Sequence, residues 1–343
     1  MAGDNSFRIL SILCAAILVA AALYLGSAIF APVAMSLFVI AIVWPLQKTI
    51  EARIPRVFAL LLTLSATVVV IGTLALITSW GIGMVGRWLI ANMGRFQELY
   101  GHTTEWLDGH GILLAGQFAE RFNALSLVRL FQDIVARING LVGFSVMVLI
   151  FTMLGLLEVR DFQQKIQAMN NGLTGDRILE AAARISHKFR KYLLVRTLAS
   201  ILTGFVVWGF TYALDIELAA AWGVIALALN YIPVIGPLFA TVLPTLFTAA
   251  QFESWQMAAI VFVGLNIIQF VIGSYLEPRF SGTALAVSPF LIVFAVFFWT
   301  FLWGIPGAFI GVPVTMAILT VCESGSSSRW IATLLSGPVR DDA

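Results

Sequence analysis

Long apolar runs separated by short charged segments make up most of the chain. A hydrocarbon core about 30 Å thick needs roughly 20 apolar residues of helix, and most of the runs approach or exceed that length. They are Ile9–Ser27, Ile29–Trp44, Val57–Gly83, Leu141–Leu157, Leu198–Leu214, 218–251, Trp255–Leu276 and Phe280–Cys322. The pattern predicts an all-α polytopic membrane protein with about eight membrane-embedded segments.

One of these runs is interrupted in its middle. Pro233, Gly236 and Pro237 lie at the centre of residues 218–252, which carry no charged side chain. Each half of this run is about 20 Å long as a helix, too short to cross the core. Hydrocarbon cannot hydrogen-bond the backbone groups that proline frees, so such a break must be buried in protein or line a polar cavity. We therefore expect a helical hairpin with a polar tip, an arrangement typical of transport sites.

The last apolar run, Phe280–Cys322, is long enough for two crossings. Ser288-Pro289 opens it, and Gly304-Ile305-Pro306-Gly307 interrupts it near the middle. Its expected backbone breakers are Gly304, Pro306, Gly307 and Pro313. The run predicts a second interrupted hairpin, because glycine and proline weaken a helix interior. The alternative is that these residues only permit close helix packing.

Composition excludes several classes of function. Of 343 residues, 60% are hydrophobic and 11% charged, whereas a soluble domain carries about 25% charge. The net charge of +2 gives no reason to expect a nucleic-acid partner. Cys14, Cys322 and the three histidines have no metal-ligand spacing, so we expect no metal and no cofactor. No lysine follows a glycine and no hydrolase motif is present, which predicts neither an enzyme nor ATP-driven transport.

Lysine and arginine placement predicts the orientation in the membrane. The loops after the second and fourth runs carry Lys48, Arg53, Arg56, Arg160, Lys165, Arg177, Arg184, Lys188, Arg190, Lys191 and Arg196. The connections at 215–217 and Glu253 carry acids only. By the positive-inside rule both termini should be cytoplasmic and residues 84–140 extracytoplasmic. The first run is expected to stay as a transmembrane helix rather than to be a cleaved signal peptide.

The segments outside the membrane also have helical patterns. Apolar residues of Val85–Tyr100 and Leu127–Ile138 recur at helical spacing, and Asn139-Gly140 should end the second of these helices. The basic helix after Gly175 either lies on anionic lipid or only sets topology. The expected division is 1–83 for N-terminal spans, 84–140 for an extracytoplasmic helical arm, 141–157 for a span, 158–197 for a basic amphipathic cytoplasmic helix, 198–322 for a transport core with two hairpins and 323–343 for a cytoplasmic tail.

No charged residue lies in the middle of a span, so the candidate site is built from uncharged polar groups. Asn266, Gln269, Gly273 and Glu277 follow at spacings of three, four and four, on one predicted helix face. With Asn230 and Tyr231 of the hairpin tip, this face is expected to line a path for a small neutral polar solute. The alternative is that the amides only join helices, at roughly 1 kcal/mol each. Glu277 and Arg279 are gate candidates, or else they cap a helix end.

Five motifs resemble those of the autoinducer-2 exporter family of bacterial membrane proteins. They are Asn230-Tyr231-Ile232-Pro233-x-x-Gly236-Pro237 with Pro244, Asn266-x-x-Gln269, Leu276-Glu277-Pro278-Arg279-Phe280, Ser288-Pro289, and Trp303-Gly304-x-x-Gly307-Ala308-x-x-x-Val312-Pro313. The order of spans is similar over nearly the whole chain, while the specific motifs lie within 219–313. The chain departs at Phe280-Ser281-Gly282-Thr283, where the family often carries a methionine-glycine pair.

The resemblance implies a bacterial inner-membrane transporter that exports a small, neutral, hydroxyl-rich signal of the autoinducer-2 kind. It also implies a homo-oligomer, with the solute and membrane lipid as its other partners. Alternating access without ATP hydrolysis is the expected mechanism. Some relatives look like cation/proton antiporters, for which Glu277 would be the carboxylate. A third alternative is a scaffold that transports nothing and binds partners through its outer arm.

Overall fold

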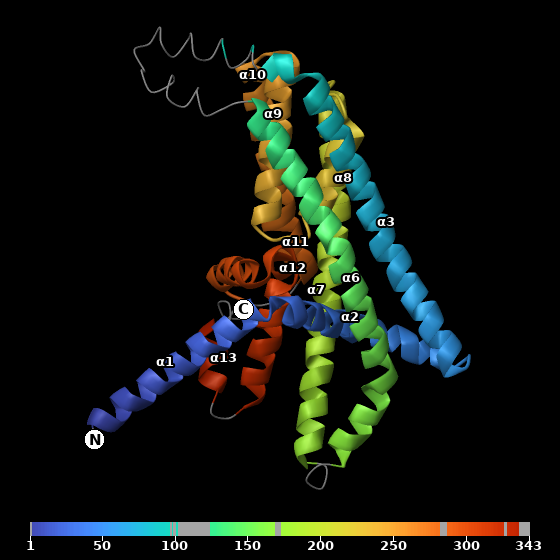
Figure 1. Ribbon diagram of the computed structural model, residues 1–343, viewed down its shortest axis with the longest axis vertical. Helices are drawn as coiled ribbons and strands as arrows, with labels where there is room; N and C mark the ends of the chain where they lie inside the picture. Colours follow the sequence, from blue (N-terminus) through green and yellow to red (C-terminus); the bar gives the residue numbers. More distant parts are fainter. Residues whose placement is uncertain are drawn as a thin grey trace. The chain divides into compact units, whose positions relative to one another are not determined.

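The protein is built from helices. The computed structural model describes residues 2–96, 98, 101, 124–168, 173–281, 287–325 and 328–335, and every regular element in these ranges is helical (Figure 1). Seven of the described helices are long and apolar enough to cross a membrane, and two shorter apolar helices accompany them. The predicted all-α polytopic membrane fold is therefore confirmed.

The helices follow the predicted apolar runs closely. They are α1 (Ala2–Leu25), α2 (Ser27–Glu51), α3 (Arg56–Ala91), α6 (Ala124–Gln167), α7 (Leu173–Ala213), α8 (Ala219–Leu229), α9 (Ile235–Phe252), α10 (Trp255–Phe270), α11 (Glu277–Ser281), α12 (Pro289–Ser324) and α13 (Arg329–Leu335), with a π-helix at Val271–Leu276 between α10 and α11 (Figure 1). Helix α12 begins at the expected Ser288-Pro289 step. Proline suits this position because the first turn of a helix leaves its N–H groups unpaired.

One predicted helix end is wrong. Helix α6 continues through Asn139-Gly140, which we expected to terminate the outer helical arm. A glycine inside a helix costs only about 1 kcal/mol, so Asn139-Gly140 does not by itself end a helix. Residues 102–123 of the predicted arm 84–140 lie outside the described residues.

The chain divides into two compact units. Unit 1 contains Met1–Ser65, Gly143–Tyr192 and Thr283–Ala343, and unit 2 contains Ala66–Val142 and Leu193–Gly282. The two interrupted hairpins belong to different units, since α8 and α9 lie in unit 2 and α12 lies in unit 1. Residues 198–322, which we expected to form one core, therefore contribute to both.

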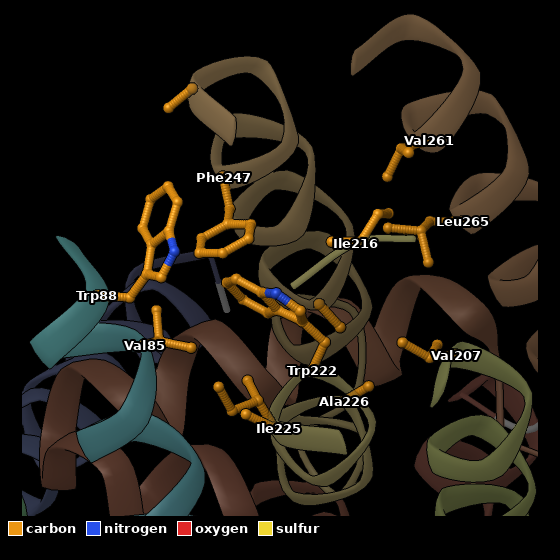
Figure 2. Packing of buried hydrophobic residues seen from close by; sticks show 13 residues of the cluster. Val85, Trp88, Val207, Ile216, Trp222, Ile225, Ala226, Phe247, Val261 and Leu265 are labelled. Atoms are coloured by element: carbon orange, nitrogen blue, oxygen red, sulfur yellow. The ribbon is translucent and has the colours of Figure 1, made fainter. Parts of the chain in front are cut away.

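Unit 2 has an aromatic core around the first hairpin. Figure 2 shows the ring of Phe247 beside the indoles of Trp88 and Trp222, and the ring centroids are 4.0 and 5.1 Å away. Glycines bring α7 and α8 into backbone contact, because a Cβ built on Gly223 would lie 2.8 Å from the Gly204 carbonyl oxygen. Close approach through small residues is the usual way for membrane helices to associate. This packing fixes the hairpin arm against α7.

Unit 1 has its own core around α12. Phe38 of α2 and Phe189 of α7 pack with Trp299 and Trp303, which are buried together with Ile310. Hydrogen bonds and ion pairs join the polar ends of these helices. The Lys188 ammonium lies 3.3 Å from the Glu323 carboxylate, and the Ser186 hydroxyl donates to the Ala41 carbonyl.

Candidate functional site

Both ends of the first hairpin meet at one end of unit 2. The Gln251 side chain, at the end of α9, donates to the Asp215 carbonyl (3.0 Å) and accepts from the Glu217 N–H (2.9 Å), just before α8. The indole N–H of Trp88 donates to the Glu217 carboxylate at the same place. With eleven residues, α8 is about 16 Å long. The hairpin therefore enters and leaves at one end and turns back inside the bundle, as predicted.

The non-helical segment at the hairpin tip is shorter than the sequence predicts. Helix α8 ends at Leu229 and α9 begins at Ile235, so Gly236 and Pro237 lie in the first turn of α9. Proline is tolerated there because its missing N–H would have no partner in any case. A Cβ on Gly236 would overlap the carbonyl oxygen of Leu229, so the arms are in backbone contact at this glycine.

Val234 closes the tip in a strained turn. Its φ is 66° and its ψ is −58°, and the Ile235 N–H donates to the Pro233 carbonyl at 2.7 Å. This is a γ-turn with positive φ, a rare conformation and an unfavourable one for a β-branched residue. Residues held this way cost about 1–3 kcal/mol and concentrate at functional sites. Val234 is also 46% exposed, although it lies between two apolar helices.

Two polar side chains of the tip are held by hydroxyl groups of α7. The amide of buried Asn230 donates to the Ser200 hydroxyl at 3.3 Å, and the Tyr231 hydroxyl donates to the Thr197 hydroxyl at 3.1 Å. All four groups are neutral and each hydroxyl can both donate and accept. The tip is thus a small, uncharged, hydrogen-bonding cluster about 16 Å from the open end of the hairpin.

The gate candidates lie beside this cluster and have separate partners. The Glu277 carboxylate accepts from the Arg196 guanidinium at 3.1 Å, and Arg196 directly precedes Thr197 on α7. Arg279 instead stacks on the Tyr275 ring, 4.3 Å from its centroid. Glu277 and Arg279 therefore do not pair with each other. The Arg196–Glu277 pair ties the end of the α10 segment to α7.

The predicted continuous face from Asn266 to Glu277 is interrupted. Between Val271 and Leu276 the chain forms a π-helix, and the Glu277 N–H donates to the Ile272 carbonyl five residues earlier. Pro278 explains the wider turn, because it supplies no N–H and its ring crowds the carbonyl four residues before it. The extra residue in this turn rotates Glu277 away from the face that the spacing predicted.

The two amides of this span differ in their surroundings. Asn266 is exposed and donates to the Phe262 carbonyl of its own helix at 2.7 Å. Gln269 is half-buried, and its amide nitrogen has no hydrogen-bond partner among the described residues. Among the described residues, Asn230 is hydrogen-bonded to Ser200 and not to either of these amides. Gln269 is the stronger of the two candidates for contact with a solute.

The second hairpin turns at Gly304, with φ 64° and ψ −140°. Its two arms fold onto each other, because the Trp299 indole donates to the Thr315 hydroxyl at 3.1 Å. A Cβ on Gly307 would overlap the Trp299 carbonyl oxygen. Pro306 comes two residues after the turn, whereas Pro313 lies in the helical second arm.

Sequence reasoning missed the contribution of α7. The positive-inside rule predicts only a topology-setting role for Arg196, and it predicts nothing for Thr197 or Ser200. A signal is present, since Arg196, Ser200 and Thr203 recur at four and three in a run whose remaining residues are apolar except for Thr197. That spacing places them on one helix face.

Fold and site together define a multi-pass helical membrane protein with re-entrant hairpins, one of which has a polar tip. The family model for the AI-2E family transporter matches residues 12–327, and the chain belongs to this family of membrane transporters. It is a multi-pass protein of the bacterial inner membrane.

Several curated relatives agree with this assignment. The AI-2 transport protein TqsA of Escherichia coli (strain K12) is 28% identical over 97% of this chain and 96% of its own length. The protein YhhT of the same strain is 26% identical over 87% of this chain and 84% of its own length. A relative from Haemophilus influenzae is 25% identical over 98% of both chains.

Proposed function

We propose that this transporter exports a small neutral polar solute, a hydroxyl-rich signal of the autoinducer-2 kind, by alternating access without ATP hydrolysis. The observation that carries the proposal is the uncharged cluster of Asn230, Tyr231, Thr197 and Ser200 at the hairpin tip. A neutral polyol can exchange hydrogen bonds with such groups without the cost of burying a charge. The name of the relative TqsA supports the choice of signal.

In this proposal Asn230, Tyr231 and Gln269 contact the solute, and Asn266 lines its approach. The buried, unpartnered amide nitrogen of Gln269 supports its role, because such groups carry a free-energy cost unless a partner arrives. The breakers Pro233, Gly236, Pro237, Gly304, Pro306, Gly307 and Pro313 shape the two hairpins. Glu277 acts as a gate through its bond to Arg196, while Arg279 stabilises the same helix end through Tyr275.

The hairpin tip is the proposed moving part. The hydrogen bonds of Asn230 and Tyr231 to hydroxyl groups of α7 join neutral groups and contribute about 0.5–1.5 kcal/mol each, so a bound solute can replace them. Strain at Val234 further lowers the cost of leaving this conformation. Exchange of tip-to-α7 bonds for tip-to-solute bonds would then open the path from one side at a time.

The experiment measures extracellular autoinducer-2 in cells that lack the gene and in cells that overexpress it. Overexpression should raise the external signal and deletion should lower it. The double variant Asn266→Leu, Gln269→Leu should insert normally and fail to restore export in the deletion strain. Equal external signal in all strains would contradict the proposal.

A cation/proton antiporter is the second candidate, because Glu277 is a half-buried carboxylate in the candidate span Trp255–Phe280. Its ion pair with Arg196 argues against it, since this 3.1 Å contact would have to open before the carboxylate could bind a cation. Sodium addition to proteoliposomes would move pH if the antiporter function were correct. No pH movement is expected.

The predicted orientation and assembly belong to the same proposal. Both termini should be cytoplasmic, as the placement of lysine and arginine requires, and the protein should form a homo-oligomer. Reporter fusions at each terminus test the first point, and mass measurement of the purified protein tests the second. An extracytoplasmic terminus would overturn the proposed orientation in the membrane.

A further inference from the structure

Helix α7 carries a third hydroxyl group on the face that holds the hairpin tip. Thr203 follows Ser200 by three residues, so the two side chains share one face of the helix. The next residue, Gly204, is in backbone contact with Gly223 of α8, the arm that leads to the tip. Thr203 therefore lies on the stretch of α7 that packs against the hairpin.

The Thr203 hydroxyl differs from the hydroxyls of three other fully buried helical threonines. Thr211, Thr248 and Thr320 are equally buried, and each donates to the carbonyl four residues earlier at 2.8 Å. Thr203 is 0% exposed, yet its hydroxyl has no hydrogen-bond partner among the described residues. An unpartnered buried hydroxyl is unfavourable and requires an explanation.

We infer that Thr203 and Ser200 form a specificity-determining pair that hydrogen-bonds the hydroxyl groups of a neutral solute at the hairpin tip. The inference rests on the proposed function, and it identifies the α7 side chains that would line the site opposite Asn230. Ser200 accepts one long bond from Asn230, at 3.3 Å, and keeps a proton that it can donate. Thr203 supplies a second donor and acceptor that the fold itself leaves unused.

This arrangement explains selection for hydroxyl-rich solutes. A site whose polar groups are paired only by the correct ligand rejects an analogue that lacks the matching hydroxyl, because the buried groups then stay unpaired. A purely apolar wall would not discriminate in this way. A cation site would instead need several oxygen ligands with net negative charge, and the α7 pair is neutral.

The test uses the purified full-length protein in proteoliposomes, with autoinducer-2 as the transported probe. Thr203→Val replaces the hydroxyl by a methyl group of similar size. We expect the KM for autoinducer-2 to rise roughly tenfold, as one lost hydrogen bond implies, with an unchanged or higher unfolding temperature. Thr203→Ser keeps the hydroxyl and should retain a KM close to that of the original protein.

Thr211→Val is the matched control, because it makes the same substitution at a buried position of the same helix. The Thr211 hydroxyl is already bonded to its own helix, so the KM should not change. Ser200→Ala is a second variant, also expected to raise the KM, in case Thr203→Val does not fold.

The outcomes separate the two claims. If the original protein moves autoinducer-2 and both Thr203→Val and Ser200→Ala leave the KM unchanged, the inference is wrong while the proposed function stands. A fall in unfolding temperature for Thr203→Val as large as that for Thr211→Val would also overturn it, because the hydroxyl would then be structural. If the original protein moves no autoinducer-2, both claims fail.

Discussion

The hairpin α8–α9 and the hairpin within α12 use the same backbone arrangement with different side chains. In each, the helix breaks at a residue with positive φ, Val234 or Gly304. In each, a glycine just after the break lies against a carbonyl of the preceding arm, Gly236 on Leu229 and Gly307 on Trp299. Where the first hairpin presents Asn230 and Tyr231, the second presents tryptophans.

This difference is the reason for proposing the first hairpin, and not the second, as the solute site. The indoles of the second hairpin have fixed partners, since Trp299 donates to Thr315 and Trp303 donates to the Leu23 carbonyl, both at 3.1 Å. Their large apolar rings fill the tip and leave their polar groups satisfied. The first hairpin instead has weak neutral bonds, a strained residue and buried polar atoms. The two hairpins therefore share a backbone break and differ in the side chains at it, and the proposed solute site depends on the polar side chains of the first.

The largest effect, a loss of folded protein, should come from substitution of the glycine that follows the break in each hairpin. Gly236→Ala and Gly307→Ala each force a methyl group onto a backbone carbonyl that cannot move without displacing a helix arm. Overpacking of this kind costs about 1–3 kcal/mol or more, so both variants should give little folded protein in detergent. Gly209→Ala is the control, because nothing lies within 4 Å of its Cβ position. A good yield of folded protein for either Gly236→Ala or Gly307→Ala would contradict the close glycine-to-carbonyl contact that the two hairpins share.

The next largest effects should differ between the two hairpins, one variant changing stability and the other changing export. Trp299→Leu should lower the free energy of unfolding by about 3 kcal/mol, because a large buried ring is lost, without a change in the KM for solute. Asn230→Leu should do the opposite, abolishing export while the unfolding temperature changes little. Export loss for Trp299→Leu at full stability would mean that both hairpins handle solute.

Smaller changes in stability are expected from substitutions that test the backbone strain at the two breaks. Val234→Gly should stabilise the protein by about 1 kcal/mol, the relief of strain less the backbone entropy of glycine. Gly304→Ala should destabilise it by a similar amount, because φ 64° with ψ −140° suits only glycine. Thermal unfolding of both variants measures the opposite signs. Destabilisation by Val234→Gly would contradict the strain assigned to the first tip.

Much of this architecture could be predicted from the sequence. Apolar runs gave the helices, and Pro233 and Gly304 marked the two interruptions because few other residues break a helix inside lipid. The sequence predicts that the two breaks exist more accurately than it predicts which residues they contain. Pro237 was read as part of the break, yet proline is as compatible with a first helical turn as with a turn between helices.

The remaining features depend on contacts between distant residues. Nothing local shows that Arg196 pairs with Glu277, since the two lie 81 positions apart. The π-helix arises from Pro278 acting on the turn before it, which strict helical spacing from Asn266 does not anticipate. Asn139-Gly140 resembles a helix end, but a single glycine costs only about 1 kcal/mol in a helix, and α6 continues through it.

Water access at the first tip tests the central claim most directly. After replacement of Cys14 and Cys322, Val234→Cys and Leu302→Cys are each exposed to a membrane-impermeant maleimide in intact cells and in inverted vesicles. Val234 is 46% exposed and Leu302 is 4% exposed, each close to a hairpin turn. The account predicts labelling of Val234→Cys from an aqueous side, reduced by autoinducer-2, and no labelling of Leu302→Cys. Complete protection of Val234→Cys in every condition would contradict a solute-facing tip.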